Sequence, residues 1–354
     1  MEELIRRKIR EFGPIPFPSF MEEALYHPEL GYYARETRQV GRGGDFYTSV
    51  SVGPLFGELL ARRFLQWWEN AGSLAKWRII ESGAHDGTLA ADVLTELRSL
   101  SPTAFSALEY SIPEPLPRLQ AAQRETLAGF SCVRFLSSSA ELASEPLPGI
   151  AFGNELLDAL SFHIIEWRDD RWHECLVALE NDRFVWKLDT QPLSDALRLA
   201  LADLPGPFPE GYRTEVRTCF IGFFQPLLAA LTSGLLIWPD YGYERDDYYH
   251  PDRTTGTLRT FSKHRAAEDP LAAPGEMDIT AHVDFTAATR AAESLGCRPL
   301  GLRTQSAWLT GLAREWLLAQ EGKPDPAGLR QFQTLTHPGH LGTRFHILEL
   351  GKEG

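Results

Sequence analysis

The chain has 354 residues, of which 43% are hydrophobic and 23% charged, a composition that allows a sizeable globular core. Its formal net charge is −13, and no run of basic residues stands out against this acidic total. A nucleic-acid partner is therefore disfavoured, and a basic protein partner fits the charge better.

The N-terminal sequence MEELIRRKIREFG has acidic residues at its start and no apolar core, unlike a secretory signal or a transit peptide. No stretch approaches the roughly 20 apolar residues that a membrane-spanning helix needs. The cysteines form no CxxC pair, which suits a reducing compartment. We therefore expect a cytoplasmic protein without membrane insertion. His337 and His340 lie in a proline–glycine loop typical of a surface segment, so no metal is expected.

Residues 1–75 are predicted to form helices separated by loops. Helical periodicity covers Glu2 to Phe12, Phe20 to Tyr26 and Val52 to Glu69. Between the last two lies GYYARETRQVGRGGDFYTS, and long ordered loops so rich in glycine and aromatic residues usually bind ligands. We predict a helical N-terminal cap with a loop that covers a ligand.

Strands and helices alternate from Trp77 onwards. The strand patterns are WRIIESG (77–83), ALEYSIPE (107–114), CVRFLSS (132–138) and GIAFGN (149–154). Helical patterns cover 87–100 and 115–129, and ELLDAL (155–160) is predicted as a helical turn. This alternation indicates βαβ units and a parallel sheet, so residues 76–354 are predicted to form one enlarged α/β domain.

Two insertions are predicted in that domain, at about 166–232 and at 244–283. The first begins with close turn signals at 168–170 and 181–182, which indicate an antiparallel meander, followed by helices at 191–203 and 215–232. SGLLIWPDYG (233–242) restores the parallel pattern, and the second insertion follows it. A helix over 284–296 and a strand over 344–352 complete the domain.

The motif that begins at Glu81 lies between a buried strand and a helix and reads ESGAHDG. Gly83 and Gly87 allow a tight turn and a close backbone approach, and the helix N-terminus offers N–H groups to an anion. Glu114 at the end of the next strand is suited to hold ribose hydroxyls. The acidic start and the lack of GxGxxG spacing favour a methyl donor over a dinucleotide. A common structural turn is the alternative interpretation.

A second motif, NELLDAL, follows the fourth strand of this series. In a helix, Glu155 and Asp158 would stand at i and i+3 on one face. With the Asn154 carbonyl they could orient a nitrogen nucleophile, and two carboxylates suit an arginine guanidinium. The structural alternative is an asparagine cap with acids near a helix N-terminus.

Together these motifs resemble one family over almost the whole chain. This is the bacterial and mitochondrial methyltransferase family that includes the protein-arginine methyltransferase assisting respiratory complex I assembly. The segments that carry the resemblance occur in the family's order: FMEEALYHPELGYY (20–33), GDFYTS (44–49), LFGELLA (55–61), ESGAHDGTLAADVL (81–94), NELLDAL (154–160), DYG (240–242), GTLR (256–259), PGEMDITAHVDF (274–285) and TQ (304–305).

The resemblance implies a class I, Rossmann-like core with a mixed seven-stranded sheet, S-adenosylmethionine as methyl donor, and S-adenosylhomocysteine as product. The residues that it assigns to the cofactor are Gly44, Tyr47, Thr48, Glu81, Gly83, Ala84, His85, Gly87, Glu114 and Asn154. Asn154, Glu155 and Asp158 are the expected catalytic residues beside the transferring methyl. The expected substrate cleft contains Asp240, Tyr241, Asp278, Thr280 and His282. A protein client is implied, with a complex I subunit as the family's example.

The sequence departs from the family at His85, where the family's turn has its middle glycine, and at Ser161, where the family has proline. The imidazole of His85 must either point away from the ligand or contact it. These departures leave open an assembly chaperone that binds the donor or its product with little or no catalysis. An NAD-dependent oxidoreductase is disfavoured by the glycine spacing. The 166–188 meander is a candidate surface for a client or a homodimer.

Overall fold

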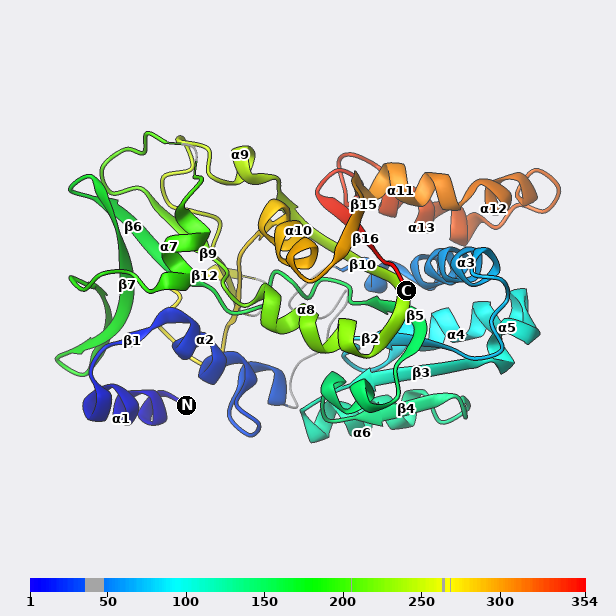
Figure 1. Cartoon of the computed structure of the whole chain (residues 1–354), viewed down its shortest axis with the longest axis horizontal. Coiled ribbons are helices and arrows are strands. Elements are labelled where there is room, and N and C mark those ends of the chain that lie inside the picture. Colours follow the sequence, from blue (N-terminus) through cyan, green and yellow to red (C-terminus); the bar gives the residue numbers. More distant parts are fainter. Residues whose placement is uncertain (36–47, 205, 263–264, 268) are drawn as a thin grey trace. The chain divides into compact units, whose positions relative to one another are not determined.

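A computed structural model describes residues 1–35, 48–204, 206–262, 265–267 and 269–354 (Figure 1). The chain divides into two compact units, each assembled from three stretches of sequence. Unit 1 comprises Met1–Gln39, Asp158–Ile221 and Gly242–Arg290, and unit 2 comprises Val40–Leu157, Gly222–Tyr241 and Ala291–Gly354. This division differs from the predicted boundary at residue 75, because helix α3 (Leu55–Asn70) belongs to unit 2.

Unit 2 is built on a mixed sheet with the strand order β15-β16-β10-β5-β2-β3-β4. The strand bounds are β2 (Trp77–Glu81), β3 (Leu108–Pro113), β4 (Val133–Leu136), β5 (Leu147–Phe152), β10 (Leu231–Tyr243), β15 (Cys297–Thr304) and β16 (Phe345–Lys352). The strands from β10 to β4 are parallel, and β16 runs antiparallel to both of its neighbours. Within the described part of the chain, these seven strands match the mixed seven-stranded sheet that the family resemblance implies. The short β14 (Val283–Asp284) adds an eighth by pairing with the end of β10 within unit 1.

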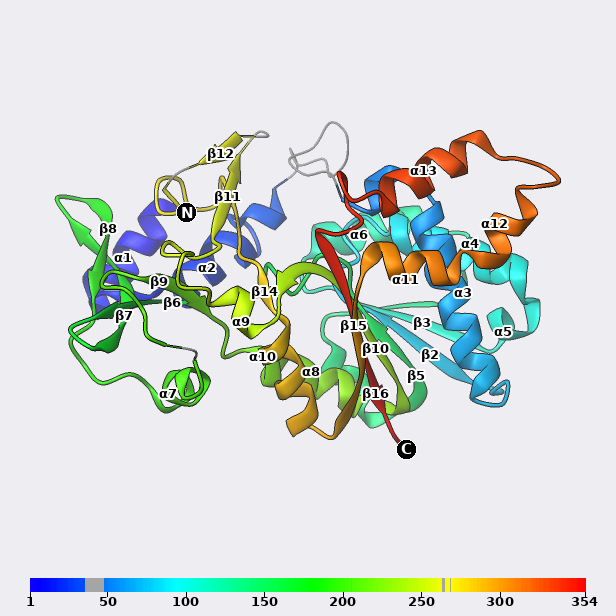
Figure 2. The same ribbon diagram turned by 90° about the horizontal axis from the view of Figure 1, so that it is seen from above.

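Side chains of the central strands are apolar on both faces, as parallel strands covered by helices require. Ile79, Ile237 and Ile347 lie in the core cluster with residues of α3 and α4 (Thr88–Leu100), which lie side by side in Figure 2. On the other face, Trp238 packs against aromatic side chains of α8 (Phe220–Ala229). The predicted strands of residues 77–154 are therefore confirmed as β2, β3, β4 and β5 of this sheet, with β4 at one edge.

Unit 1 contains the predicted antiparallel meander. Its strands are β6 (His163–Arg168), β7 (Arg171–Glu180) and β8 (Arg183–Leu188), joined by turns with positive φ at 169–170 and 181–182. The edge strands β1 (Ile15–Pro16) and β9 (Arg213–Val216) pair with β7 and β6. Helices α1 (Glu2–Phe12) and α2 (Phe17–Tyr26) contribute Ile5, Ile9, Phe17 and Phe20 to the apolar cluster of this unit.

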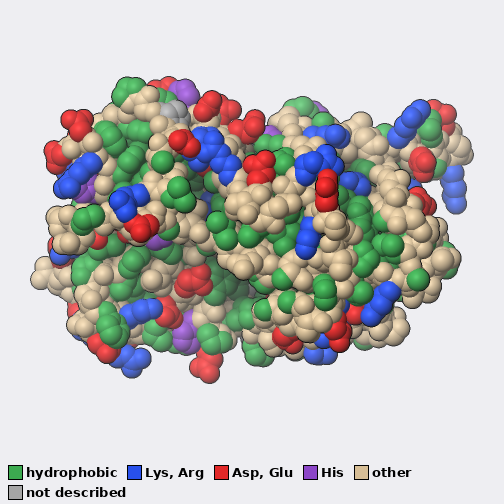
Figure 3. Space-filling model, in the orientation of Figure 1, with side chains coloured by type: hydrophobic (Ala, Val, Ile, Leu, Met, Phe, Trp, Pro, Cys, Tyr) green, Lys and Arg blue, Asp and Glu red, His purple; other side chains and the backbone are tan. Residues whose placement is uncertain are grey.

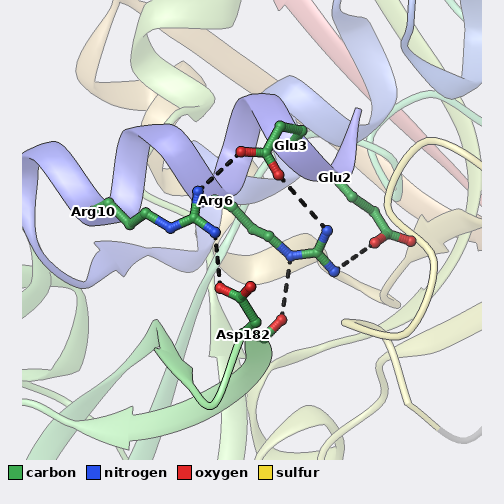
Figure 4. Close-up of polar contacts among 5 residues, drawn as sticks. All are labelled: Glu2, Glu3, Arg6, Arg10 and Asp182. Atoms are coloured by element: carbon green, nitrogen blue, oxygen red, sulfur yellow. Dashed lines mark hydrogen bonds and ion pairs between the residues drawn. The ribbon is translucent and has the colours of Figure 1, made fainter.

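The polar face of α1 is tied to the turn between β7 and β8 (Figure 4). Arg10 donates to Asp182 Oδ1 at 2.8 Å and to Glu3 at 2.9 Å, and Arg6 donates to the Asp182 carbonyl. Arg6 also pairs with Glu2, one helical turn earlier. Because these side chains are largely exposed, the apolar face of α1 supplies most of its stability.

Two predictions about secondary structure are corrected. The helix expected over 215–232 begins only at Phe220, since Arg213–Val216 forms the edge strand β9 beside β6. Residues 297–304 form β15, which the sequence analysis did not predict because arginine, proline and glycine interrupt its apolar pattern. The remaining elements are η1 (Tyr32–Ala34), η2 (Val50–Val52), α5 (Pro102–Ser106), α6 (Pro117–Thr126), η3 (Ser139–Ser144), α7 (Asp195–Leu201), α9 (Arg245–Tyr248), β11 (Arg259–Ser262), β12 (Arg265–Ala267), β13 (Asp278–Thr280), α10 (Phe285–Ser294), α11 (Gln305–Leu312), α12 (Arg314–Ala319) and α13 (Pro326–Thr336).

The surface mixes charges of both signs. On the face in Figure 3, acidic and basic side chains are interspersed with neutral ones. This distribution agrees with a sequence of net charge −13 that lacks a basic run. Among the described residues, no helix combines the length and the hydropathy needed to cross a bilayer.

Arg78 is a fully buried cation in the central strand β2. Its Nε donates to Glu109 at 2.8 Å, and its Nη1 donates to the carbonyls of Glu145 and Ala230. Removing one partner of a buried ion pair leaves the other charge and the carbonyls without compensation. Arg78 therefore links β2 to β3 and to the residues that precede β5 and β10, in addition to the backbone ladder.

We predict that Arg78→Met lowers the free energy of unfolding by about 3–5 kcal/mol. The matched control is Arg134→Met, which also removes an arginine near Glu109 but one that is 40% exposed, and it should cost no more than about 1 kcal/mol. Urea unfolding followed by tryptophan fluorescence measures both values. Equal losses in the two variants would contradict a special role for the buried cation.

Candidate functional site

Several predicted site residues of unit 2 follow the carboxyl ends of adjacent parallel strands. Glu81 ends β2, Glu114 follows β3, and Asn154 lies two residues beyond β5. Within the sheet, β3 and β4 lie on one side of β2, whereas β5 and β10 lie on its other side. Such a reversal of strand order is the point at which open α/β sheets bind ligands.

The turn from β2 to α4 has a left-handed backbone at three positions. The φ angles are 71° at Gly83, 47° at His85 and 85° at Gly87. Glycine adopts this conformation freely, whereas histidine does so at an energetic cost. The His85 imidazole is 36% exposed and its Nδ1 lies 3.7 Å from Asp86 Oδ1. The ring thus lies close to the Asp86 carboxylate.

Asp86 also caps α4. Its Oδ1 accepts from Thr88 N at 3.0 Å. Burial opposes the ionised form, but His85 and the Thr88 N–H outweigh it and lower the pKa of Asp86 to about 2. A stable negative charge therefore lies two residues before the start of α4.

Glu114 has a 6% exposed carboxylate at the end of β3. Its Oε1 accepts from Leu116 N at 2.9 Å and its Oε2 from Gln123 Nε2 at 3.2 Å, while burial raises its pKa. Gln123 Nε2 also donates to the His85 carbonyl, which joins the two parts of the motif. Gln123 was not among the predicted site residues, and it is fully buried on α6.

Glu81 is buried beside Tyr110. The tyrosine hydroxyl donates to Glu81 Oε2 at 2.6 Å. Burial raises the pKa of Glu81 to about 7, even though the hydrogen bond from Tyr110 lowers it. The carboxyl group therefore changes protonation near neutral pH.

The turn after β5 is not helical, so the predicted helical turn over 155–160 is wrong. Glu155 has φ 51°, and its N–H donates to the Pro239 carbonyl at 2.9 Å. The next N–H, of Leu156, donates to Asp240 Oδ2 at 3.1 Å. Because the bonds to β10 hold Glu155 at a φ outside the right-handed helical region, the i and i+3 helical face expected for Glu155 and Asp158 does not form.

The Glu155 carboxylate is held from two sides. Its Oε1 accepts from Ser49 N and from Asn154 Nδ2, each at 3.1 Å. The Ser49 hydroxyl donates to Gln305 Oε1, and Gln305 Nε2 donates to the Leu335 carbonyl. Ser49 and Gln305 are fully buried. They were not among the predicted site residues, although both belong to the quoted segments GDFYTS and TQ.

Three further residues of the N-terminal loop were predicted to bind the cofactor, and the structure describes one of them. Gly44 and Tyr47 lie outside the described residues. Thr48 lies just before η2, where its N–H donates to Ser51 Oγ at 3.0 Å and its Oγ1 accepts from Ser51 N at 3.2 Å. Thr48 thus shapes the short helix that follows the buried Ser49.

The five predicted cleft residues fall into both units. In unit 2, Asp240 is buried and its Oδ1 accepts from Tyr241 N, while the Tyr241 ring packs edge-on against Phe345. Unit 1 contains Asp278 and Thr280 on β13, and His282 two residues further on. Asp158 also belongs to unit 1 and is the first residue of the second stretch of that unit.

Arg217, just beyond β9, holds the unit 1 segments that carry Asp158 and His282. Its guanidinium donates to the main-chain carbonyls of Asp158, Leu160, Ala281 and His282, at 2.6–3.2 Å. Burial, together with nearby arginines, lowers the pKa of His282 to about 4, so this imidazole is neutral at physiological pH. Sequence analysis missed Arg217, which lies outside every motif.

Glu215, on β9, fixes the quoted segment GTLR. It accepts from the N–H groups of Thr257 and Leu258, and from the Thr257 hydroxyl at 2.9 Å. Gly256 has φ 71°, and a Cβ there would lie 2.2 Å from Glu215 Oε1. The glycine of this segment is therefore required by the carboxylate that binds its backbone.

The groups of unit 2 fit a methionine-containing nucleoside. Among the described residues, nothing hydrogen-bonds to the buried Gln123 Oε1 or Asn154 Oδ1, and both can accept from ammonium or hydroxyl groups. The Gly83 backbone leaves no room for a Cβ, which would lie 2.9 Å from Leu156 Cδ1. Acceptors of this kind are what the hydroxyls of a sugar and the ammonium of an amino acid moiety need.

The pKa of Glu81 predicts how stability depends on pH. Between about pH 4.5 and 7 the folded chain keeps a proton on Glu81 that the unfolded chain has lost, so stability falls as pH rises through this window. We expect Glu81→Gln to remove that loss, about 1.4 kcal/mol per pH unit relative to the parent chain. Urea unfolding from pH 5 to 8 measures it.

The control for this prediction is Glu69→Gln, which changes an exposed carboxyl group on α3 of the same unit. Its unfolding free energy should follow the parent at every pH. Parallel curves for Glu81→Gln and the parent would show that the carboxyl group of Glu81 ionises in the folded state as it does in the unfolded one.

Comparison with known proteins agrees with this geometry. Residues 59–303 match a family model described as "putative S-adenosyl-L-methionine-dependent methyltransferase". A protein from Burkholderia thailandensis, whose crystal structure contains bound S-adenosyl-homocysteine, is 31% identical and superposes with a TM-score of 0.87. That comparison covers all of this chain and 92% of the other.

Curated relatives match along almost the full length. The Drosophila melanogaster "Protein arginine methyltransferase NDUFAF7 homolog, mitochondrial" is 31% identical over 98% of this chain and 83% of its own. The human protein arginine methyltransferase NDUFAF7 is 28% identical over 97% of this chain and 81% of its own. Both are named as mitochondrial proteins, which contradicts the cytoplasmic location expected from the N-terminal sequence.

The expected class I core and the expected methyl donor are thus confirmed. The fold has the mixed sheet of that class, and the crystal structure of the Burkholderia thailandensis relative contains the demethylated product of the donor. This chain belongs to the family of S-adenosyl-L-methionine-dependent methyltransferases.

Proposed function

We propose that this chain methylates an arginine side chain of a protein. Support comes from two relatives at about 30% identity that are named protein arginine methyltransferases and are aligned over nearly the whole chain. The observation that carries the proposal is the fixed carboxylate of Glu155, which two hydrogen bonds hold after the carboxyl end of β5. Arginine is the nucleophile that most needs such a group, because its cation is delocalised and hard to deprotonate.

The donor would be held by residues of unit 2. The turn at Gly83, Ala84, His85 and Gly87 would approach the methionine part, with Glu81 on the side of its ammonium. Glu114 would accept from the ribose hydroxyls, and Asn154 offers a buried carbonyl oxygen. Gly44, Tyr47 and Thr48 remain predicted cofactor residues. When bound, S-adenosylmethionine supplies an activated methyl group on a sulfonium.

Asn154, Glu155 and Asp158 are the proposed catalytic residues. Carboxylates match the fork of a guanidinium and draw its charge towards the nitrogens that they contact, which leaves electron density on the attacking nitrogen. Catalysis then consists of orientation and electrostatics, without a covalent enzyme intermediate. Asp240, Tyr241, Asp278, Thr280 and His282 remain the proposed wall of the acceptor site.

The family resemblance further suggests a client of the respiratory complex I type. The β6–β8 meander is the predicted surface for that client or for a second copy of the chain. Client identity is best approached without assumption, by mass spectrometry of arginine methylation in cells with and without this protein.

We predict that Glu155→Gln lowers client methylation by at least about a hundredfold. Its affinity for S-adenosylhomocysteine should stay within about threefold of the parent value. The carboxamide keeps the shape of the side chain but not the charge that polarises the guanidinium. Mass spectrometry of cells that express only the variant gives the first value, and calorimetry of the purified chain gives the second. Arginine methylation at the parental level, in a folded variant, would remove Glu155 from catalysis.

Gly83→Ala is predicted to weaken S-adenosylhomocysteine binding by about tenfold, which equals about 1.4 kcal/mol. Its φ of 71° and the 2.9 Å approach to Leu156 both force the turn to move. Gly129→Ala is the control, since a Cβ there meets nothing within 4 Å. Calorimetry should show unchanged affinity for the control, and the same result for Gly83→Ala would place the methionine part elsewhere.

A further inference from the structure

Two tyrosines of unit 1 lie together where α2 and η1 meet. The ring centroids of Tyr26 and Tyr33 are 5.4 Å apart with an interplanar angle of 30°. Tyr26 donates its hydroxyl to the Ala159 carbonyl at 2.7 Å, and Tyr33 donates to Asp278 Oδ1 at 2.9 Å. Both side chains remain partly exposed. The hydroxyls are thus engaged, which leaves the rings as the surface for any further contact.

Two buried carboxylates accompany these rings. Asp158 and Asp278 are each 4% exposed. Burial raises the pKa of Tyr26 and that of Tyr33 well above the ordinary value for tyrosine. The nearby Asp278 and Asp158 raise both pKa values further. Each tyrosine is therefore within electrostatic reach of both negative charges.

Thr280 supplies a polar atom beside Asp278. It is 3% exposed, and no described residue hydrogen-bonds to its Oγ1. Because β13 is a strand, Thr280 and Asp278 project from the same face, two residues apart. A buried hydroxyl oxygen without a partner needs a ligand donor or a water molecule to complete its hydrogen bonding.

We propose that Tyr26, Tyr33, Asp158, Asp278 and Thr280 form a binding site for a guanidinium group, that of the acceptor arginine. The inference rests on the proposed arginine substrate and deepens it, since the tyrosines carry no assigned role. A guanidinium stacks on an aromatic ring through its flat face and donates to carboxylates and a hydroxyl through its edge.

The geometry favours guanidinium over ammonium. An ammonium has no flat face and holds its water more strongly, so it gains less from a pair of tilted rings. Arg217 donates to the main-chain carbonyls of the segments that carry Asp158 and Thr280. It fixes the backbone of the site, and Tyr33 donates to the Asp278 carboxylate.

The test uses the full chain and three small probes: the N-acetyl methylamides of arginine, lysine and citrulline. Citrulline has the shape of arginine without its charge. Saturation-transfer NMR titrations with S-adenosylhomocysteine present should show arginine binding at least about tenfold tighter than citrulline and about threefold tighter than lysine. Equal affinity for arginine and citrulline would overturn the site.

Variants assign the binding to these side chains. Tyr33→Leu should weaken the arginine probe by about tenfold, whereas Tyr33→Phe, which keeps the ring, should weaken it by less than about threefold. Phe12→Leu is the matched control, because it removes an exposed aromatic ring of α1 in the same unit. Tyr26→Leu is the second variant if Tyr33→Leu does not fold, as judged by near-ultraviolet circular dichroism.

The possible results separate this inference from the proposed function. Unchanged arginine binding in folded Tyr33→Leu and Tyr26→Leu would refute the site, even if client arginines are methylated. Selective arginine binding that both leucine variants lose would support the site. If the chain bound arginine in this way but client arginines remained unmethylated in cells, the proposed function would be refuted and the binding site would still be supported.

Discussion

The carboxylate of Asp240 governs the geometry of the chain after β5. It accepts from the N–H of Leu156, one residue after Glu155 donates its own N–H to the Pro239 carbonyl. These two bonds fix the peptide groups on both sides of the Glu155 Cα. Glu155 is consequently held with φ 51°, a conformation that an isolated glutamate avoids. A buried acid on one strand therefore determines where the carboxylate after its neighbouring strand can lie.

The sheet and its functional edge could be predicted from the sequence, because continuous apolar runs separated by amphipathic helices have few solutions. That pattern alone predicts that Glu81 and Glu114 lie at the ends of adjacent strands. The turn after β5 could not be predicted in the same way. ELLDAL has a helical composition, and only the tertiary hydrogen bonds from β10 override it. Local propensity and long-range pairing conflict at this point, as they often do at functional sites.

Positioning residues were harder to find than the groups they position. Ser49, Gln123 and Arg217 act through backbone atoms or through a single hydrogen bond to a named carboxylate. None has a short-range spacing signature, because its partner is at least nine residues away in the sequence. Burial of a polar side chain is the property that marks them, and that property appears only when the fold is known.

The discontinuity of both units has a consequence for synthesis of the protein. The chain crosses from one unit to the other after residues 39, 157, 221, 241 and 290. The opening helices of unit 1 therefore leave the ribosome well before the meander strand β7, to which β1 pairs. Until then they expose apolar side chains that belong to a cluster not yet made. A nascent chain of this topology depends on late-arriving segments, which slows folding and favours help from chaperones.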